Sequence, residues 1–500
     1  MYNLYIEEVY KNMPFIIIII FTVIPLLVGS FASQNSISTL GDYFIYNRGM
    51  GTTISFFTVY ATWWSSFAFL GSISYFYSVG SVYWTGIAWN VLFGILYMWF
   101  GTRISRYGKA KGYLTPIHFF SDIYGSKQLN NIVILVMILF TIPYIQIQFY
   151  GGALIIEIAT NGAIPWQICA LLFYLVMIVY LWAGGLRAVA WTDVFYGSLI
   201  FFGMLAAGAI MTAQVGGVDG LFQKIIEQRP DLILLPEKSS PVGISTWLSM
   251  FIIMPIGALM GPQMWMRIYA TKEEKTFYIM PLLISLATIA YLGSMLAGSS
   301  AILLKSDGVA SSDAILPMLL VEYAPGWLMA LVMCCGAAAC LSTANSCIHA
   351  VSALLALDIY KQYFRPRSTE RHTVFIAKIS IVAFSAIAYL ALVFSESPSS
   401  IVQTGYLAFS GLAQLAVPVI GALLWYRSNS IGAVAGVFIG VSFTLVFSLW
   451  DIAVFPLHPG FIALILNAAV FILCGVLLPP NKITSNKILL YRHGSFDDFR

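Results

Sequence analysis

Charged residues are scarce in this chain. Only 9% of its 500 residues are Asp, Glu, Lys or Arg, against about 25% in an ordinary soluble domain, while 60% are hydrophobic. So little polar material cannot cover a water-facing surface, and the composition therefore indicates an integral membrane protein. The net charge of +4 is too small to suggest a nucleic-acid-binding protein. The length and apolar content exclude a secreted disulfide scaffold, a collagen and a disordered tail.

Motifs for zinc binding and ATP hydrolysis are also lacking. The chain has no CxxC pair, and its six cysteines all lie in apolar runs, where we expect them to pack in the interior. They are Cys169, Cys334, Cys335, Cys340, Cys347 and Cys474. There is no Walker loop and no paired cytoplasmic domain, so any work that the protein performs must draw on an ion gradient.

Long apolar stretches are what the sequence has in abundance. A helix needs about 20 residues to cross about 30 Å of hydrocarbon, and we count thirteen such stretches. They centre on residues 13–33, 52–79, 82–101, 131–158, 164–183, 190–214, 245–264, 276–302, 326–357, 374–395, 400–425, 431–450 and 459–479. The first resembles a signal peptide in position, but Glu7 and Glu8 with only Lys11 make a poor basic start, so we interpret it as a retained span.

Lysine and arginine collect on one side of this thirteen-span topology. Nineteen of the 25 basic residues fall there, chiefly in the loops 103–127, 267–275 and 361–371 and in the tail. Positive loops tend to stay in the cytoplasm, which predicts an external amino terminus and a cytoplasmic carboxyl terminus. Residues 218–228 and 311–323, on the opposite side, are predicted to form short external helices.

Two spans contain residues that interrupt a helix. The seventh contains Pro255, Gly257, Gly261 and Pro262, whereas in the second a break is inferred only from the Thr/Ser/Trp-rich stretch 61–66 and Gly71. Broken helices in mid-membrane mark binding sites in transporters built from inverted repeats. We therefore predict an all-α membrane fold. If the second to sixth and the seventh to eleventh spans form inverted repeats, each repeat begins with an interrupted span. The parts of this fold are an extra first helix and loop (1–50), the first repeat (51–214), an external loop (215–244), the second repeat (245–425), and two extra helices with a cytoplasmic tail (426–500).

Charged and polar groups inside spans need an explanation, because a charged side chain costs about 2.5 to 3.5 kcal/mol to insert. The hydroxyls of Ser342 and Thr343, with the carbonyl of Ala339 one turn earlier, could flank a sodium ion together with carbonyls freed on a second helix. Hydroxyls in spans also bond to a carbonyl one turn earlier or join two helices, and a carboxylate such as Asp193 can cap a helix start. From the residues alone, ion binding and helix packing both remain open.

Two motifs resemble those of the sodium:solute symporter family, which includes bacterial proline and pantothenate permeases and animal sodium/glucose cotransporters. The first is GGLRAVAWTDVF at 184–195, and the second is ACLST at 339–343 followed by LDIYK at 357–361. The likeness extends over nearly the whole chain. It implies a leucine-transporter-like fold, with two inverted five-helix repeats and a sodium site between the first core helix and the eighth.

The resemblance also implies which atoms bind the ion. The ligands would be the carbonyls of Ala61, Trp64 and Ala339 and the hydroxyls of Ser342 and Thr343, and Asp193 would serve sodium passage or a second sodium. One position departs from the pattern, because some members carry Asp or Asn where this chain has Trp63. That departure leaves the polar support of the carbonyl ligands in question, and a proton is the alternative coupling ion.

Candidate substrate-binding residues lie on the second, fourth, seventh and eleventh spans. They are Trp63, Ser65, Ser66, Tyr144, Gln146, Gln148, Gln263, Tyr406 and Gln414. We expect about half of them to contact the ligand, because Tyr and Gln in a bundle often bond only to a neighbouring helix. No lysine or arginine is expected at mid-depth, so an anionic substrate would be held by half-helix amino ends, hydroxyls, amides or the sodium itself.

The expected function is inward transport of a small organic solute coupled to sodium flow, by alternating access, in the cell membrane. The resemblance favours the organic-acid branches, monocarboxylate and pantothenate uptake, with proline-like amino-acid transport as the alternative. The expected partners are the bilayer and a small molecule, without nucleic acid or an obligate protein partner. If the solute is a monocarboxylate, one sodium makes transport electroneutral, so strong accumulation would need a second cation, for which Asp193 is the predicted place.

Other classes fit the sequence less well. A membrane enzyme is conceivable because Ser346 and His349 lie three residues apart on one helix face, but no third residue or oxyanion group accompanies them. The chain shows neither the carbonyl loops nor the charge rings of a channel, and no signalling domain that would make it a sensor.

Overall fold

The computed structural model describes residues 39–234, 242–305, 309, 311–395, 400–450, 457–480 and 482–493, with isolated positions between 17 and 31. Every regular element in these residues is a helix, as expected for an all-α fold. The first predicted span, 13–33, lies almost entirely outside the described residues, as does part of the predicted loop 215–244.

The α-helices up to the midpoint of the chain are α2 (Leu40–Ile45), α3 (Thr52–Trp63), α4 (Ser72–Val79), α5 (Thr85–Lys111), α6 (Pro116–Tyr124), α7 (Lys127–Ala159), α8 (Trp166–Gln214), α9 (Gly217–Gln228) and α10 (Ile244–Met260). Those that follow are α11 (Pro262–Ala270), α12 (Lys275–Ala287), α13 (Ala290–Leu304), α14 (Ile315–Tyr323), α15 (Gly326–Ala353), α16 (Glu370–Val393), α17 (Ile401–Ala413), α18 (Ala416–Leu424), α19 (Ser430–Leu449), α20 (Pro459–Leu477) and α21 (Lys482–His493). Short 3-10 turns are η1 (Tyr46–Arg48), η3 (Gly80–Trp84), η4 (Pro230–Leu232) and η5 (Ser312–Ala314), and π-helices are η2 (Phe67–Gly71) and η6 (Leu354–Phe364).

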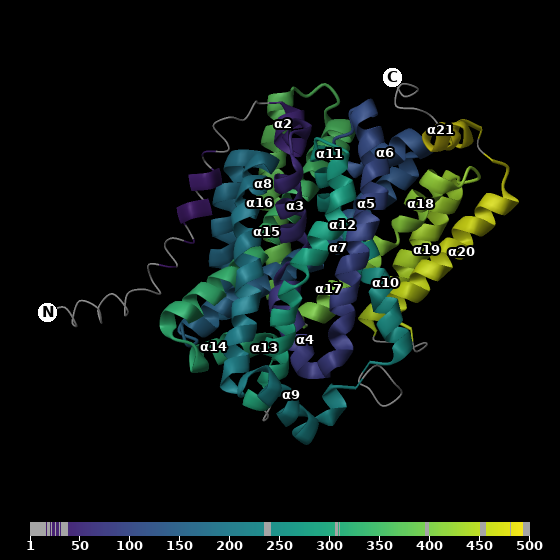
Figure 1. The fold of residues 1–500 in the computed structure, drawn as a ribbon. Coiled ribbons are helices and arrows are strands. Elements are labelled where there is room, and N and C mark those ends of the chain that lie inside the picture. The colour runs from purple at the N-terminus through teal and green to yellow at the C-terminus, as the bar shows by residue number, and fades with distance from the viewer. Residues whose placement is uncertain are drawn as a thin grey trace.

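The long helices run side by side in one bundle (Figure 1). The short helices α6 and α21 lie at one end of the bundle, and α9 and α14 lie at the other. The two predicted external helices, 218–228 and 311–323, correspond to α9 and to η5 with α14. They therefore share one end of the molecule, as the loop parity predicts.

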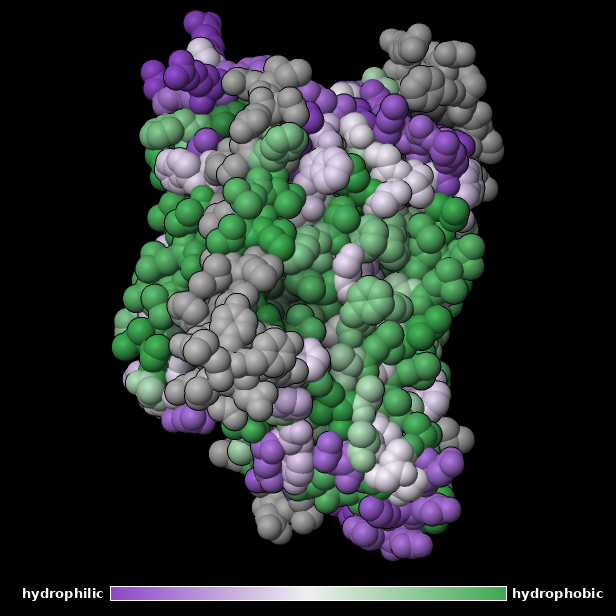
Figure 2. Space-filling view, turned by 60° about the vertical axis from the view of Figure 1, so that its left-hand side comes forward, coloured by the Kyte–Doolittle hydropathy of each residue, from purple (hydrophilic) through white to green (hydrophobic). Residues whose placement is uncertain are grey.

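An apolar band lies across the middle of the bundle surface. Figure 2 shows hydrophobic side chains over the middle of the visible face and hydrophilic ones at its two ends. Large apolar side chains such as Phe202 and Phe394 are 67% and 79% exposed. In the described part of the chain, nine helices are long and apolar enough to cross a membrane, or ten when one bent pair counts as a span. Lipid is the solvent that such a surface requires.

Two interruptions shape the centre of the bundle. α3 ends at Trp63, and Trp64 (φ −90°, ψ 83°) leaves the helical region before the chain continues through η2 into α4. The predicted break without proline is therefore present. α10 and α11 meet at a 61° bend, where Gly261 is extended and Pro262 occupies the first position of α11. A missing N–H costs nothing at that position, whereas Pro255 remains inside α10.

α8 covers both the fifth and the sixth predicted spans, and the chain turns within it at Gly185. This residue has φ 57°, a conformation that side chains with a Cβ rarely adopt. A Cβ at this position would lie 2.7 Å from the carbonyl oxygen of Tyr43. Glycine is therefore required both by the backbone and by the close approach of α2.

α15 lies in the interior, where it contacts α3, α7, α8 and α11. Every residue from 338 to 354 is buried. Any hydroxyl or carboxylate on these facing surfaces is remote from water and must find partners within the protein. The polar groups that meet here form the candidate site.

Candidate functional site

The end of α3 faces the serine and threonine pair of α15. Ser342 Oγ donates a hydrogen bond to the carbonyl oxygen of Ala61 at 2.8 Å and lies 3.2 Å from that of Ala339. Thr343 Oγ1 lies 3.4 Å from Ala61 O and 3.1 Å from the carbonyl oxygen of Thr62. The structure thus brings together four of the five predicted main ligands, and the fifth, Trp64, is the first residue beyond the break.

The break explains why these carbonyls can accept side-chain hydroxyls. In a continuous helix the Ala61 carbonyl would accept from the N–H of Ser65, but Ser65 lies beyond the end of α3. Neighbouring oxygens that bind a Ca²⁺-sized cation at about 2.4 Å, some 70–90° apart, are separated by about 2.8–3.4 Å. Na⁺ is similar in size, so the separations around Ala61 fit such an ion.

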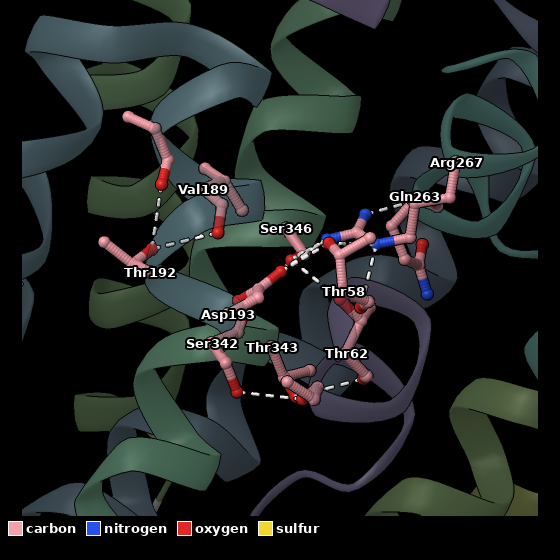
Figure 3. A network of polar contacts seen from close by, with 12 residues as sticks. Thr58, Thr62, Val189, Thr192, Asp193, Gln263, Arg267, Ser342, Thr343 and Ser346 are labelled. Atoms are coloured by element: carbon pink, nitrogen blue, oxygen red, sulfur yellow. Dashed lines mark hydrogen bonds and ion pairs between the residues drawn. The ribbon is translucent and has the colours of Figure 1, made fainter. Parts of the chain in front are cut away.

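A buried ion pair lies beside this cluster. Arg267 on α11 directs Nη2 to Asp193 Oδ2 at 3.2 Å, and the two side chains are 1% and 0% exposed. Thr58 Oγ1 donates to the same carboxylate oxygen at 2.5 Å, while Arg267 Nε donates to the carbonyl and hydroxyl oxygens of Thr58 at 3.0 Å. Arg267 Nη1 donates to the Gln263 carbonyl at 3.1 Å. Figure 3 shows these groups converging from α3, α8, α11 and α15.

The placement of Arg267 in a loop was wrong, because this residue lies on α11 with its side chain 1% exposed. Arg267 is followed closely by Lys272 and Lys275, and for that reason it was assigned to a cytoplasmic loop. The short helix α11 instead brings it back into the bundle, with every residue from Pro262 to Ala270 buried. Asp193 was the available signal, because a carboxylate buried in a span requires an opposite charge.

One hydroxyl joins the ion pair to the predicted sodium ligands. Ser346 Oγ donates to the Ser342 carbonyl at 2.7 Å and accepts from Arg267 Nη2, and it lies 2.9 Å from Thr62 Oγ1. His349 does not join this network, because its Nε2 is hydrogen-bonded to the carbonyl oxygen of Tyr43 at 3.1 Å. The serine and histidine considered as a hydrolytic pair therefore have separate partners.

The helical segment that begins at Ser66, after the break at Trp64, is capped at its amino end by side chains. Ser66 N donates to Gln148 Oε1 at 3.0 Å, and Ser66 Oγ donates to the Ile147 carbonyl at 2.9 Å. Ser65 Oγ accepts from the N–H of Phe67 at 3.1 Å. Three of the candidate substrate residues, Ser65, Ser66 and Gln148, therefore meet at the break.

Aromatic candidates surround the same place. Trp63 and Tyr144 both pack against Phe409 of α17, with ring centroids 5.5 and 4.7 Å away. Tyr406 packs against Phe67 at 5.8 Å. Phe409 could not be predicted from the sequence, because one aromatic in an apolar run has no distinctive spacing.

The remaining candidates are placed differently. Gln263 bonds to Arg267 through its carbonyl, whereas its side-chain Oε1 has no hydrogen-bond partner among the described residues. Gln146 is half-buried and lies two positions from Gln148, so it points to another side of α7. Gln414 is bound to α20: its Nε2 donates to the Gly460 carbonyl, and Asn467 donates to its oxygens.

The model of the sodium:solute symporter family matches residues 43–440. The chain belongs to the sodium:solute symporter family. The resemblance predicted from the two motifs is thereby confirmed.

Individual relatives of this symporter align over most of its length. The uncharacterized symporter YhjB of Bacillus subtilis is 26% identical over 91% of this chain and 95% of its own. The sodium/pantothenate symporter of Haemophilus influenzae is 26% identical over 84% and 86%, and the osmoregulated proline transporter OpuE of Bacillus subtilis is 25% identical over 89% and 91%. A solved Na⁺-coupled sialic acid symporter superposes with a TM-score of 0.78 at 20% identity, covering 94% of this chain and 98% of that one. This likeness shows that the two share a fold.

The symporter is therefore a multi-pass cell-membrane protein that uses Na⁺ as its coupling ion. Family membership identifies it as a transporter and gives no support to the hydrolytic alternative.

Proposed function

We propose that the symporter moves a small organic solute inward together with sodium bound by Ala61, Trp64, Ala339, Ser342 and Thr343. The observation that carries this proposal is the convergence of the two α15 hydroxyls on a carbonyl freed by the break after α3. When sodium binds, each hydroxyl proton turns away from Ala61 so that an oxygen lone pair faces the ion. The ion then replaces direct hydrogen bonds as the link between α3 and α15.

The proposed transport cycle uses the predicted architecture. We place thirteen spans in the membrane, with an external amino terminus and repeats at 51–214 and 245–425. In this arrangement α3 belongs to the first repeat and α15 to the second, so sodium binding strengthens contact between the repeats. The solute would occupy the adjoining space next to Trp63, Ser66 and Gln148. Sodium thereby favours the conformation that retains the solute.

A carboxylate is the solute group that the break would bind best. The half-helix that starts at Ser66 presents backbone N–H groups and a positive dipole end. Gln148 Oε1 and Ser65 Oγ now accept from those N–H groups, and a carboxylate could take their place. Monocarboxylate or pantothenate-like acids are the proposed class, and the sodium/pantothenate relative supports it. A proline-like amino acid is the second candidate, because the relative OpuE is named a proline transporter and proline also carries a carboxylate.

Charge determines how strongly one sodium can concentrate each solute. A membrane potential of about 150 mV contributes roughly 3.4 kcal/mol per charge, and a tenfold sodium gradient adds about 1.4 kcal/mol. A zwitterion moved with one sodium can be concentrated by roughly three orders of magnitude, whereas a monoanion gains only about tenfold. For a monoanion we propose a second cation at Asp193, whose Oδ1 has no hydrogen-bond partner among the described residues.

Uptake into proteoliposomes tests the sodium site. Pyruvate, lactate, pantothenate and proline are offered in sodium or in choline. We expect uptake only in sodium, with the half-saturating sodium concentration raised at least about tenfold by Ser342→Ala or Thr343→Val, because each removes an oxygen bound to a charge. Thr343→Ser keeps the hydroxyl, and Ser352→Ala removes one that bonds to the His349 carbonyl on the same helix, so both should resemble the parent. Equal uptake in choline, or unchanged sodium dependence in the Ser342 and Thr343 variants, would refute the proposal.

A further inference from the structure

The break after α3 is held by an amide from another helix. Trp63 Nε1 and Trp64 Nε1 both donate to Asn90 Oδ1, at 2.6 and 3.1 Å. Asn90 lies on α5, and its side chain is completely buried. An indole N–H can only donate, so the amide oxygen of Asn90 must face the two tryptophans. Both lone pairs of that oxygen are then used by two consecutive residues of the break.

Asn90 is itself fixed in place. Its Nδ2 donates to the Gly86 carbonyl one turn earlier in α5, at 2.5 Å. The Trp63 ring stacks on Phe93 of the same helix, with centroids 4.9 Å apart and planes at 16°. The Trp64 ring packs edge-on against Tyr291 of α13 at 5.1 Å. The two indoles can therefore turn only if these contacts are lost.

Two of the proposed sodium ligands are backbone carbonyls next to these indoles. Trp64 is the residue with non-helical angles, and its own carbonyl is one ligand. Ala61, whose carbonyl meets Ser342 and Thr343, lies only two residues before Trp63. A rotation of the Trp63–Trp64 backbone would redirect the Trp64 carbonyl relative to that of Ala61, which is held within α3. The position of the indoles thus determines whether the two oxygens can face the same point on α15.

We propose that Asn90 is a positioning residue for the sodium site. It fixes the tandem tryptophans so that the carbonyls of Ala61 and Trp64 face α15. It thereby supplies, from α5, the polar support for these carbonyls that an Asp or Asn at position 63 would give in some other family members. The proposal rests on the sodium site described above. Asn90 acts through the two indoles and does not contact the ion.

Sodium binding without solute tests this role. The purified symporter is titrated with sodium chloride against choline chloride, and the rise in melting temperature gives the sodium midpoint. Asn90→Leu keeps the size of the side chain and removes the acceptor, so we expect a midpoint about tenfold higher, the effect of losing a pair of ordinary hydrogen bonds. Asn90→Asp retains an acceptor for both indoles and should not raise the midpoint.

Trp89→Phe is the matched control for Trp63→Phe. Trp89 precedes Asn90, and its Nε1 has no hydrogen-bond partner among the described residues. Trp63→Phe should raise the midpoint severalfold, Trp89→Phe should leave it within about twofold, and adding Trp63→Phe to Asn90→Leu should have little further effect. If Asn90→Leu does not fold, the two phenylalanine variants carry the comparison.

The outcomes separate this proposal from the one on which it rests. An unchanged midpoint in Asn90→Leu, or an equal shift in Trp89→Phe and Trp63→Phe, overturns the role of Asn90 and leaves the sodium site standing. A raised solute KM at an unchanged sodium midpoint overturns it as well, because Asn90 would then act on the solute. If the parent protein shows no sodium effect, the sodium site is refuted and the role of Asn90 falls with it.

Discussion

Neutralising Arg267 alone should destabilise the symporter strongly. In Arg267→Gln the Asp193 carboxylate stays buried, with the hydroxyl of Thr58 as its remaining partner in the described part of the chain. Breaking a buried ion pair on one side costs about 3–5 kcal/mol. An unfolding entropy of about 2.1 cal/mol/K per residue amounts to about 1 kcal/mol/K for 500 residues. We therefore expect the melting temperature to fall by about 3–5 °C.

The double variant Arg267→Gln with Asp193→Asn removes both charges and should recover most of that loss. Arg106→Gln is the control, because the pair of Arg106 with Glu274 is 54% and 36% exposed, and such pairs contribute at most about 1 kcal/mol. The assay is thermal unfolding in detergent, followed by tryptophan fluorescence. Sodium should also stabilise Arg267→Gln more than the parent, since the positive charge of Arg267 then no longer opposes a cation at Asp193. A single variant as stable as the parent, or a double variant no better than the single one, would contradict the reasoning.

Three further predictions concern other parts of the molecule. Burial raises the pKa of Asp313 above its ordinary value of 3.8, so the folded protein binds this proton more tightly than the unfolded chain and stability declines as pH rises through and above 3.8. Asp313→Asn keeps an acceptor for the N–H of Ile401. The melting temperature of this variant should therefore depend less on pH between pH 4 and 7 than that of the parent. Gly185→Ala should lower the melting temperature more than Gly112→Ala, because both have positive φ but only Gly185 faces Tyr43 at 2.7 Å; equal losses would exclude that contact as the cause. Uptake of a zwitterion with sodium should carry inward current, and so should uptake of a monocarboxylate if a second cation binds at Asp193 as proposed; zero current with the carboxylate would exclude that second cation.

The helices could be predicted because their causes are local. Apolar run length determines where a helix can cross a bilayer, and the amphipathic stretch 218–228 forms α9. Pro262 after Gly261 located the second break for the same reason, since the missing N–H acts on its own neighbours. The first break was predicted from hydroxyl and indole content, which is a weaker local signal.

The contacts between helices were harder to predict from the sequence. Spacing placed Ser342 and Thr343 on one helix but could not tell ion ligation from helix packing, and the pairing with Ala61 came from the family resemblance. Arg267 was missed because α11 has only nine residues and follows a bend, so its charge looked like part of the next loop. Asn90 was missed because one amide in an apolar run has no periodicity, and its partners are 26 and 27 residues away in sequence.

The two helix breaks differ in whether the backbone can form continuous helical hydrogen bonds across them. At Trp64 every residue retains its N–H, so the hydrogen bonds that would unite α3 with the segment after it can form again. At Gly261 the following proline has no N–H to donate to the Ala258 carbonyl, so this hydrogen bond between α10 and α11 can never form. The first break can therefore straighten into a continuous helix with all of its backbone hydrogen bonds, whereas the second cannot. The break at Trp63 and Trp64 is thus the one that can change during a conformational transition.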